Sequence, residues 1–406
     1  MTPRTPRTIV IAAAAIALIA SGCSTSSSQG IGKSGSRTLT IALGGPFSGS
    51  EKPTGDQIRA GAKLAAKQVN DGGGITAGPH KGAKIAFKEF DDADDPAKAA
   101  TAIRTIVSDK SLVAFVGSGL SDASIAAAPV ASRAGFAYLS AYASSEKILA
   151  AATGKKSVFV VPPTFPAYAF SVLNQLLADG HRRPAILHLQ GTYGDGIAGL
   201  TVKGLADQGV TPTANESFTF TDTDLRTQLA KIKASNPDSL VMVGLANSDA
   251  LIVKQANDLG LVVPFYDNGG ITNSHTFLKD AGALAEGVVG NTPDAPTLGA
   301  KGRALHSAYQ AVTGEALLPD PAAFAYEGVL AVAAAFAEGA EGRDDLAAHL
   351  HKISIDDTGV GSLRFADDGS RTGGRLYVYR ITDGKPKFLT GYEQTGPMEV
   401  KEVGLS

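Results

Sequence analysis

The chain has a single cysteine and almost equal numbers of basic and acidic residues. The first excludes stabilisation by disulfides, and the second disfavours a polyanionic partner. Cys23 is the single cysteine among 406 residues, so no internal disulfide can form and the domains depend on their apolar cores for stability. The 37 basic and 39 acidic residues leave a net charge of −2, and no long run of one sign occurs. A nucleic acid or another polyanion is therefore not an expected partner.

Several motifs that carry chemistry are missing too. The sequence has no G-x-x-x-x-G-K-[ST] phosphate loop and no G-x-S-x-G nucleophile elbow. Its seven histidines are scattered, and His349 and His351 are two residues apart, which places them on different faces of a helix. We therefore expect no metal and no cofactor, and a binding function rather than catalysis.

The N-terminus has the composition of an export signal. A basic start precedes twelve apolar residues, 9–20, which are too few for a bilayer-spanning helix, since that takes about 20. Residues 20–23, Ala-Ser-Gly-Cys, resemble the lipobox of bacterial lipoproteins, which implies a signal peptide over 1–22 and a lipid on the thiol of Cys23. An ordinary signal peptide is the alternative. The Ser/Gly-rich residues 24–36 are expected to form a flexible tether.

From residue 37 on, apolar runs of strand length alternate with segments whose apolar residues keep the three-to-four spacing of a helix. This alternation predicts parallel sheets covered by helices on both faces. Pro-marked breaks at 162–163 and 291–296 divide it into two units, and a third change of unit is expected near 365–369. The last predicted element is a hairpin over 375–389.

Two segments allow two interpretations each. The carboxylates of Asp91 to Asp95 are numerous enough for a cation site, but Asp95-Pro96 is also a helix start and the Gly turn of a cation loop is missing, so we expect capping. The apolar segment Asp320–Gly339 has the length of a bilayer span. Its Pro321 and Glu327 favour a helix buried in a protein core.

One stretch, Leu112–Ser145, predicts a binding rim. Its pattern is strand, turn, helix, strand and polar loop, with Ser121 at the start of the helix and Ser144 in the loop. Loops that leave neighbouring parallel strands emerge at the same rim, and a helix start offers free N–H groups. We therefore expect Ser121 and Ser144 to face a small carboxylate.

A similar phrase returns later in the chain. Val116–Ile125 aligns without a gap with Val243–Ile252, and Val, Gly, Ser, Asp, Ala and Ile agree. Chance is one explanation, because strand-to-helix turns reuse Gly, Ser and Asp for capping. The other is two similarly built halves that each present a helix start to a shared cleft. The second phrase contributes Asn247 as a candidate ligand residue.

The chain resembles the leucine/isoleucine/valine-binding family of type I periplasmic binding proteins over about residues 38–400. The resemblance implies an α/β fold of two Rossmann-like three-layer lobes joined by a three-stranded hinge. Lobe 1 would comprise 37–160 and 291–365, and lobe 2 would comprise 161–290 and 366–406. The matching motifs are Pro46-Phe47-Ser48-Gly49, Gly55-Asp56-Gln57, Gly61-Ala62, Asn70 to Ile75, Asp91-Asp92 with Asp95-Pro96, Val116-Gly117 with Ser121, Gly135 to Ser140, and Tyr193-Gly194.

The same resemblance implies a ligand site. Ser121 corresponds to a Ser hydroxyl that holds the ligand carboxylate, and Ser144 to a Thr hydroxyl that takes part. Tyr142 corresponds to a position whose backbone contacts the ligand, and Tyr193 to the second-lobe tyrosine that covers it.

Two positions depart from the family pattern. A first-lobe position that is often Tyr is Thr54 here, and the acid that binds the ligand ammonium falls at Gly269. An ammonium buried without an acid costs several kcal/mol. Asp267, two residues earlier, is therefore the expected substitute for the missing acid.

We expect an extracytoplasmic substrate-binding lipoprotein of an ABC importer, monomeric and anchored by Cys23 to the outer face of the cytoplasmic membrane. It would pass a small carboxylate-bearing solute, with a branched-chain amino acid as the first choice, to permease and ATPase subunits. One alternative is a ligand that is not an amino acid, such as an aromatic or aliphatic acid or an amide. Another is a signalling receptor without transport, and the missing motifs disfavour an α/β enzyme.

Overall fold

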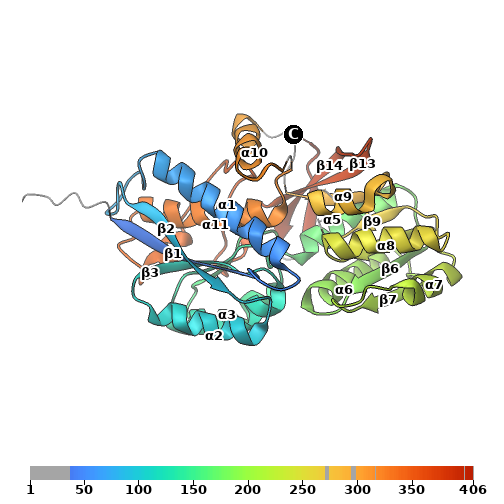
Figure 1. The fold of residues 1–406 in the computed structure, drawn as a ribbon, viewed down its shortest axis with the longest axis horizontal. Helices are drawn as coiled ribbons and strands as arrows, with labels where there is room; N and C mark the ends of the chain where they lie inside the picture. The colour runs from blue at the N-terminus through green and yellow to red at the C-terminus, as the bar shows by residue number, and fades with distance from the viewer. Residues whose placement is uncertain (1–36, 270–273, 294–298, 316, 397, 406) are drawn as a thin grey trace, which may run out of the picture. The chain divides into compact units, whose positions relative to one another are not determined.

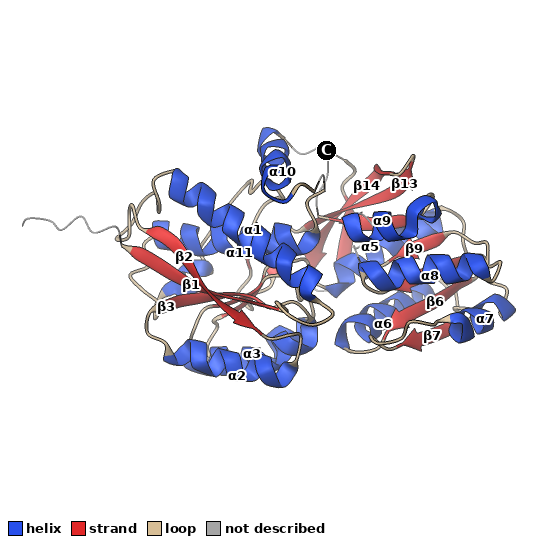
Figure 2. Cartoon of the chain, viewed as in Figure 1, coloured by secondary structure: helices blue, strands red, loops and turns tan. Residues whose placement is uncertain are grey.

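The computed structural model describes residues 37–269, 274–293, 299–315, 317–396 and 398–405, so the expected signal peptide, Cys23 and the tether lie outside the described residues. Within the described residues, the strands form a five-stranded, an eight-stranded and a two-stranded sheet (Figure 1). Figure 2 shows helices flanking both of the larger sheets, each of which is the centre of one lobe.

The first sheet has the strand order β2-β1-β3-β4-β5, and its strands are all parallel. Helices α1 and α11 cover one face and helices α2 and α3 the other (Figure 1). Successive side chains of β1 alternate between these faces, because Ile41 and Leu43 pack with α1 and α11 whereas Ala42 packs with α2 and α3. The bounds are β1 Thr38–Gly45, β2 Lys84–Asp91, β3 Leu112–Gly117, β4 Tyr138–Ser140, β5 Val158–Val160, α1 Lys52–Asp71, α2 Pro96–Ser108, α3 Ser121–Ala134 and α11 Asp320–Ala337.

The second sheet has the order β15-β14-β13-β10-β9-β8-β6-β7. Strands β6 to β10 are parallel, and β13, β14 and β15 are antiparallel. The expected hairpin is β13 and β14, and β15 adds the edge strand beside it. Leu240 and Met242 pack with α7, α8 and α9, and Val241 and Val243 pack with α5 and α6. The bounds are β6 Pro184–Leu189, β7 Asn215–Phe218, β8 Ser239–Val243, β9 Phe265–Asp267, β10 Val289–Thr292, β13 Arg375–Thr382, β14 Lys385–Gly396, β15 Glu399–Glu402, α5 Phe165–Ala178, α6 Thr192–Asp207, α7 Arg226–Ala234, α8 Ala246–Asp258 and α9 His275–Ala281.

The remaining described elements are shorter or lie between the sheets. They are α4 Glu146–Ala151, the 3-10 helix Gly282–Ala285, α10 Ala300–Thr313, α12 Leu346–Leu350, and the paired strands β11 Arg364–Phe365 and β12 Arg371–Thr372.

Helix α11 is the central helix of the first lobe. It is long and apolar enough, by length and composition, to cross a membrane, yet 78% of that segment is buried inside the structure. It packs directly on α1 at Gly61, where an added Cβ would lie 1.9 Å from the carbonyl oxygen of Ala322. Pro321 lies in its first turn and Glu327 is fully buried within it, as expected for a helix of a protein core.

The acidic loop before α2 caps that helix, as expected. Asp95 Oδ1 accepts hydrogen bonds from the backbone N–H groups of Ala97 at 2.8 Å and Lys98 at 2.9 Å. Asp91 Oδ1 accepts the N–H of Phe47 at 2.8 Å and so fixes the loop after β1. Within the described residues, no group of three or more His, Cys, Asp or Glu side chains is arranged to hold a metal ion.

The chain passes between the lobes three times, after β5, after β10 and after β12. We propose limits for the two lobes from the strands on either side of these passages. Because β10 belongs to the second sheet and β12 pairs with β11, we place the second and third passages after Thr292 and Thr372. These points lie a few residues beyond the expected limits at 290 and 365.

A buried ion pair ties two of these passages to α11. The guanidinium of Arg371 donates to both carboxylate oxygens of Glu327, at 2.5 and 3.0 Å, and the two side chains are 3% and 0% exposed. The same guanidinium donates to the carbonyl oxygens of Val161 at 3.0 Å and Ser362 at 2.6 Å. Arg371, in β12, therefore joins the segment after β5, the segment before β11 and the core of the first lobe.

Replacing Arg371 should destabilise the protein strongly, because Arg371→Met leaves the carboxylate of Glu327 buried without a counter-charge. Losing one partner of a buried pair costs about 3–5 kcal/mol. The matched control is Arg364→Met, since Arg364 pairs with Asp356 on the surface, and exposed pairs contribute less than about 1 kcal/mol. Urea unfolding midpoints should fall clearly for Arg371→Met only. Equal shifts in the two variants would contradict this role of the pair.

Candidate ligand-binding site

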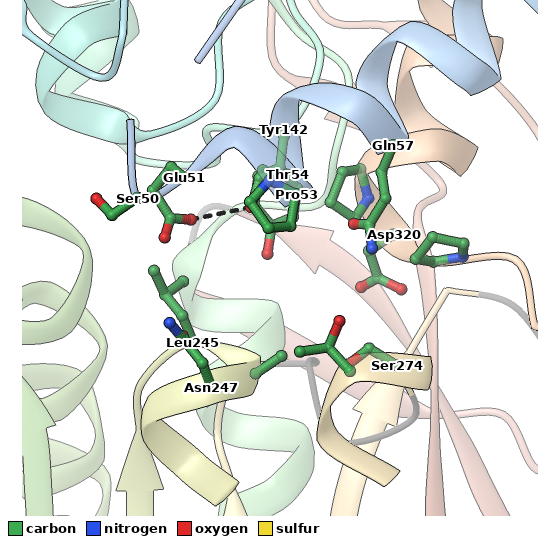
Figure 3. A pocket seen from close by; sticks show the side chains of 14 residues that line it. Ser50, Glu51, Pro53, Thr54, Gln57, Tyr142, Leu245, Asn247, Ser274 and Asp320 are labelled. Atoms are coloured by element: carbon green, nitrogen blue, oxygen red, sulfur yellow. Dashed lines mark hydrogen bonds between the residues drawn. The ribbon is translucent and has the colours of Figure 1, made fainter. Parts of the chain in front are cut away.

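Two pockets adjoin each other at the carboxyl ends of the parallel strands. The first, which we call the hydroxyl pocket, has an empty volume of about 350 Å³. The second, which we call the acid pocket, has an empty volume of about 590 Å³ (Figure 3). Tyr142 and Leu245 line both pockets, so the two pockets are neighbours.

The hydroxyl pocket contains most of the predicted ligand residues. Its described lining comes from the loops after β3 and β4 and from helix starts and loops of the second lobe. The lining residues are Gly119, Leu120, Ser121, Tyr142, Ala143, Ser144, Tyr168, Tyr193, Leu245 and Gly269. The structure thus brings Ser121, Tyr142, Ser144, Tyr193 and Gly269 together.

Two buried serines line this pocket with hydroxyl groups that make no hydrogen bond to the described residues. Ser121 is the first residue of α3 and is 2% exposed, and Ser144 follows β4 and is 6% exposed. Neither hydroxyl has a hydrogen-bond partner among the described residues. The first N–H groups of α3 beside them have no partner within the helix, as at any helix start. Hydroxyls and N–H groups in this position favour an anion such as a carboxylate.

The Tyr193 side chain occupies the space beside Gly269. Its hydroxyl donates to the carbonyl oxygen of Gly244 at 3.1 Å. An added Cβ at Gly269 would lie only 2.0 Å from that hydroxyl oxygen, so position 269 has no room for an acidic side chain while Tyr193 stays there. The absence of a side chain at Gly269 and the position of Tyr193 therefore depend on each other.

The other predicted residues lie outside the hydroxyl pocket. Asp267 is fully buried, is not among the lining residues of either pocket, and accepts the N–H of Gly269 at 2.7 Å, so it fixes the backbone at Gly269. Asn247 is exposed at the start of α8 and lines the acid pocket. The two copies of the repeated phrase both form a strand end and a helix start, one in each lobe.

The acid pocket holds two carboxylates that the sequence reasoning missed. Glu51, just before α1, and Asp320, at the start of α11, are 5% and 3% exposed, and both point into the pocket (Figure 3). Thr54 donates its hydroxyl to Glu51 Oε2 at 2.9 Å, and Thr292 donates to Asp320 Oδ1 at 3.0 Å. Glu51 follows the Pro46–Gly49 motif closely, which was the one signal available in the sequence.

Burial controls the protonation of this site. It raises the pKa of Glu51, and together with the nearby carboxylates of Asp320 and Glu51 it raises the pKa of Tyr142 far above its usual value. The Tyr142 hydroxyl therefore stays protonated and can donate a hydrogen bond. Deeper in the second lobe, burial and then the charge of Asp267 raise the pKa of Asp249 well above its usual value.

A contact beside the hydroxyl pocket links the two lobes. The carboxylate of Asp122, next to Ser121, accepts the hydroxyl of Thr192, and it accepts the N–H of Thr192 at 3.4 Å. The starts of α3 and α6 are therefore joined at the edge of the pocket.

Helix α6 contains the glycine spacing of a dinucleotide-binding motif, but not at the position in the fold where that motif binds a nucleotide. Gly194-Asp195-Gly196-Ile197-Ala198-Gly199 has the G-x-G-x-x-G spacing of dinucleotide-binding folds. All six residues lie inside α6, instead of in the turn between strand and helix where that fingerprint binds a pyrophosphate. An added Cβ at Gly194 would lie 1.8 Å from the carbonyl oxygen of Leu189, so this glycine allows close packing of α6 on β6.

The fold and the site together define a two-lobed binding protein with a site for a small solute. The family model for periplasmic binding proteins matches residues 38–386, and the chain belongs to this family. The expected fold of two α/β lobes with parallel sheets is confirmed. The expectation of a binding protein that is not an enzyme agrees with the family.

Individual relatives cover most of the chain. It is 27% identical over 348 residues to the leucine-, isoleucine-, valine-, threonine- and alanine-binding protein of Pseudomonas aeruginosa, over 84% of this chain and 89% of the relative. Its fold is similar to that of the branched-chain amino acid transporter substrate binding protein LivJ from Streptococcus pneumoniae in complex with isoleucine, with a TM-score of 0.76, 24% identity, and coverage of 91% of this chain and 100% of that one.

A second solved structure with a similar fold contains a different ligand. It is the solute binding protein of an ABC transporter from Rhodopseudomonas palustris in complex with 3,4-dihydroxy benzoic acid. The TM-score is 0.78 at 19% identity, and the match covers 88% of this chain and 97% of that one.

Adding a methyl group at Gly269 should weaken ligand binding. In Gly269→Ala the new Cβ displaces the Tyr193 hydroxyl from its bond to Gly244. The ligand for this test is the amino acid that raises the melting temperature of the unchanged protein most in a thermal screen. We expect the variant to bind that amino acid about tenfold or more weakly. Gly199→Ala is the control, because a Cβ at that position of α6 meets nothing within 4 Å. Calorimetric affinities that are equal in the two variants would rule out a role for Gly269 in the site.

Proposed function

We propose that the protein is the extracytoplasmic substrate-binding component of an ABC importer and that it binds a small amino acid with a free carboxylate. The observation that carries this proposal is that the buried residues Ser121 and Ser144, beside the start of α3, line the pocket with hydroxyls that have no hydrogen bond to the described residues. The named ligands of the Pseudomonas aeruginosa relative support it, and branched-chain amino acids are accordingly the first ligands to test.

The ligand would act by joining the lobes. Both pockets have lining residues from both lobes, so a bound solute contacts both and favours the arrangement in which those contacts coexist. Permease and ATPase subunits would then receive the loaded protein as their substrate donor. The hydroxyls of Ser121 and Ser144 in the first lobe would bind the carboxylate of the ligand. Tyr193 of the second lobe would cover the ligand.

A carboxylic acid without an ammonium group is the second candidate ligand. Gly269 stands where the family acid is expected, and Asp267 bonds to the backbone of Gly269, so the described lining of the hydroxyl pocket contains no acid to pair with an α-ammonium. The 3,4-dihydroxy benzoic acid bound by the protein from Rhodopseudomonas palustris is an example of this ligand class.

Removing the Ser121 hydroxyl should weaken carboxylates selectively. A hydrogen bond to a charged group contributes about 1.5–3 kcal/mol, so Ser121→Ala should lower the affinity for L-leucine by about ten- to a hundredfold and that for L-leucinamide much less. Ser124→Ala, one turn further along α3 and outside both pockets, is the control. Isothermal titration calorimetry measures both ligands. Equal losses for acid and amide would contradict the carboxylate assignment.

A lipid on Cys23 would hold the receptor at the membrane. The proposal rests on the Ala20-Ser21-Gly22-Cys23 sequence and predicts that Cys23→Ala releases the protein from the membrane fraction without lowering its melting temperature. Ser28→Ala, in the expected tether, should remain in the membrane fraction. Immunoblots of washed membranes compare the variants, and a Cys23→Ala protein that stays bound would exclude the anchor.

A further inference from the structure

The start of α3 contacts the second lobe on both sides of Ser121. Leu120, the residue before it, packs against the apolar core of the second lobe. Asp122, the residue after it, accepts the hydroxyl and the backbone N–H of Thr192, the first residue of α6. Ser121 itself lines the hydroxyl pocket. The turn that offers its hydroxyl to a ligand therefore also joins the first lobe to the second.

Helix α6 receives a capping carboxylate from the other lobe. Gly191 precedes the helix with a φ of 108° and has no side chain that could cap it. A Cβ added at Gly191 would lie 3.3 Å from Asp122 Oδ2, so the carboxylate of Asp122 is close to this helix start. A carboxylate in this position pairs with the free N–H groups and with the positive end of the helix dipole. Separation of the lobes would remove that interaction.

The same contact adjoins the tyrosine that is proposed to cover the ligand. Thr192 directly precedes Tyr193, which lines the hydroxyl pocket and donates its hydroxyl to the carbonyl oxygen of Gly244 at 3.1 Å. Tyr193 is thus fixed at its backbone through Thr192 and at its hydroxyl through Gly244. Neither Asp122 nor Thr192 is among the described lining residues of either pocket. The two residues therefore influence a bound solute without contacting it.

We propose that Asp122 and Thr192 are positioning residues that stabilise the closed arrangement of the lobes, and we call this pair the α3–α6 clasp. The apparent affinity for a ligand rises with the population of the arrangement that binds it. A contact that favours this arrangement and does not contact the ligand should raise the affinity for every ligand by the same factor. This inference rests on the proposed function and adds a contribution to affinity that is independent of ligand identity.

The first experiment is calorimetry on the mature protein with L-leucine, L-isoleucine and 3,4-dihydroxybenzoate. Thr192→Val keeps the shape of the side chain and removes its hydroxyl, so it should weaken each ligand that binds by the same factor, about three- to tenfold. Thr192→Ser keeps the hydroxyl and should restore the affinity to within about twofold of the unchanged protein. No loss in Thr192→Val, or a loss confined to one ligand, would overturn the clasp and leave the receptor assignment intact.

Asp122→Ala supplies the other half of a double-mutant cycle. If the two side chains act through one contact, Thr192→Val should have almost no further effect on affinity in the Asp122→Ala background. Asp195→Ala is the matched control, because Asp195 also lies in the first turn of α6 but accepts the N–H of Gly191 in its own lobe, at 3.3 Å. It should leave the affinities within about twofold. Additive losses in the cycle, or an equal loss in Asp195→Ala, would contradict the clasp.

A second experiment needs no ligand and so separates this inference from the proposed function. In the Cys23→Ala background, which contains no other cysteine, the pair Asp122→Cys and Thr192→Cys should be joined by a short bismaleimide. The control pair is Asp122→Cys and Lys203→Cys, since Lys203 lies about 16 Å further along α6. Equal cross-linking of both pairs, or none at Thr192, would contradict the clasp. If the cross-link forms and none of the three solutes binds, only the proposed function fails.

Discussion

The parallel pairing of β1, β3 and β4 is the constraint on which the site depends. The register sets Leu43 beside Val116 and Gly117 beside Ser140, so the loops after these strands leave the sheet next to one another. Glu51, Ser121 and Ser144 are far apart in the sequence and meet because of this register. A slip of one residue would turn every side chain of the strand to the opposite face of the sheet, against the other helix layer, and would shift these loops relative to one another.

Much of this arrangement follows from the sequence. The alternation of apolar runs with helical spacing predicts the two parallel sheets, and the Asp95 cap and the buried α11 were identified from local patterns that act over one helical turn. Ser121 and Ser144 were placed at one rim by a topological rule that requires only the order of strand and helix. These features depend on neighbouring residues or on connectivity, and a sequence records both directly.

What could not be predicted depends on contacts between distant segments. Glu51 and Asp320 lie on the loop before α1 and at the start of α11, and nothing in either segment indicates that they line one pocket. Asp267 was chosen for its position two residues before Gly269, and its fully buried carboxylate accepts the N–H of Gly269 and is not among the lining residues of either pocket. The exclusion of a side chain at Gly269 by the Tyr193 hydroxyl depends on how α6 lies against the loop after β9, which neither segment shows by itself.

The most direct test of the account is a crystal structure of the protein with its ligand bound. The account predicts a carboxylate whose oxygens lie within about 2.5–3.2 Å of the Ser121 and Ser144 hydroxyls, with Tyr193 over the ligand. A carboxylate directed toward Glu51 and Asp320, or a ligand bound outside the space lined by Tyr142 and Leu245, would contradict it.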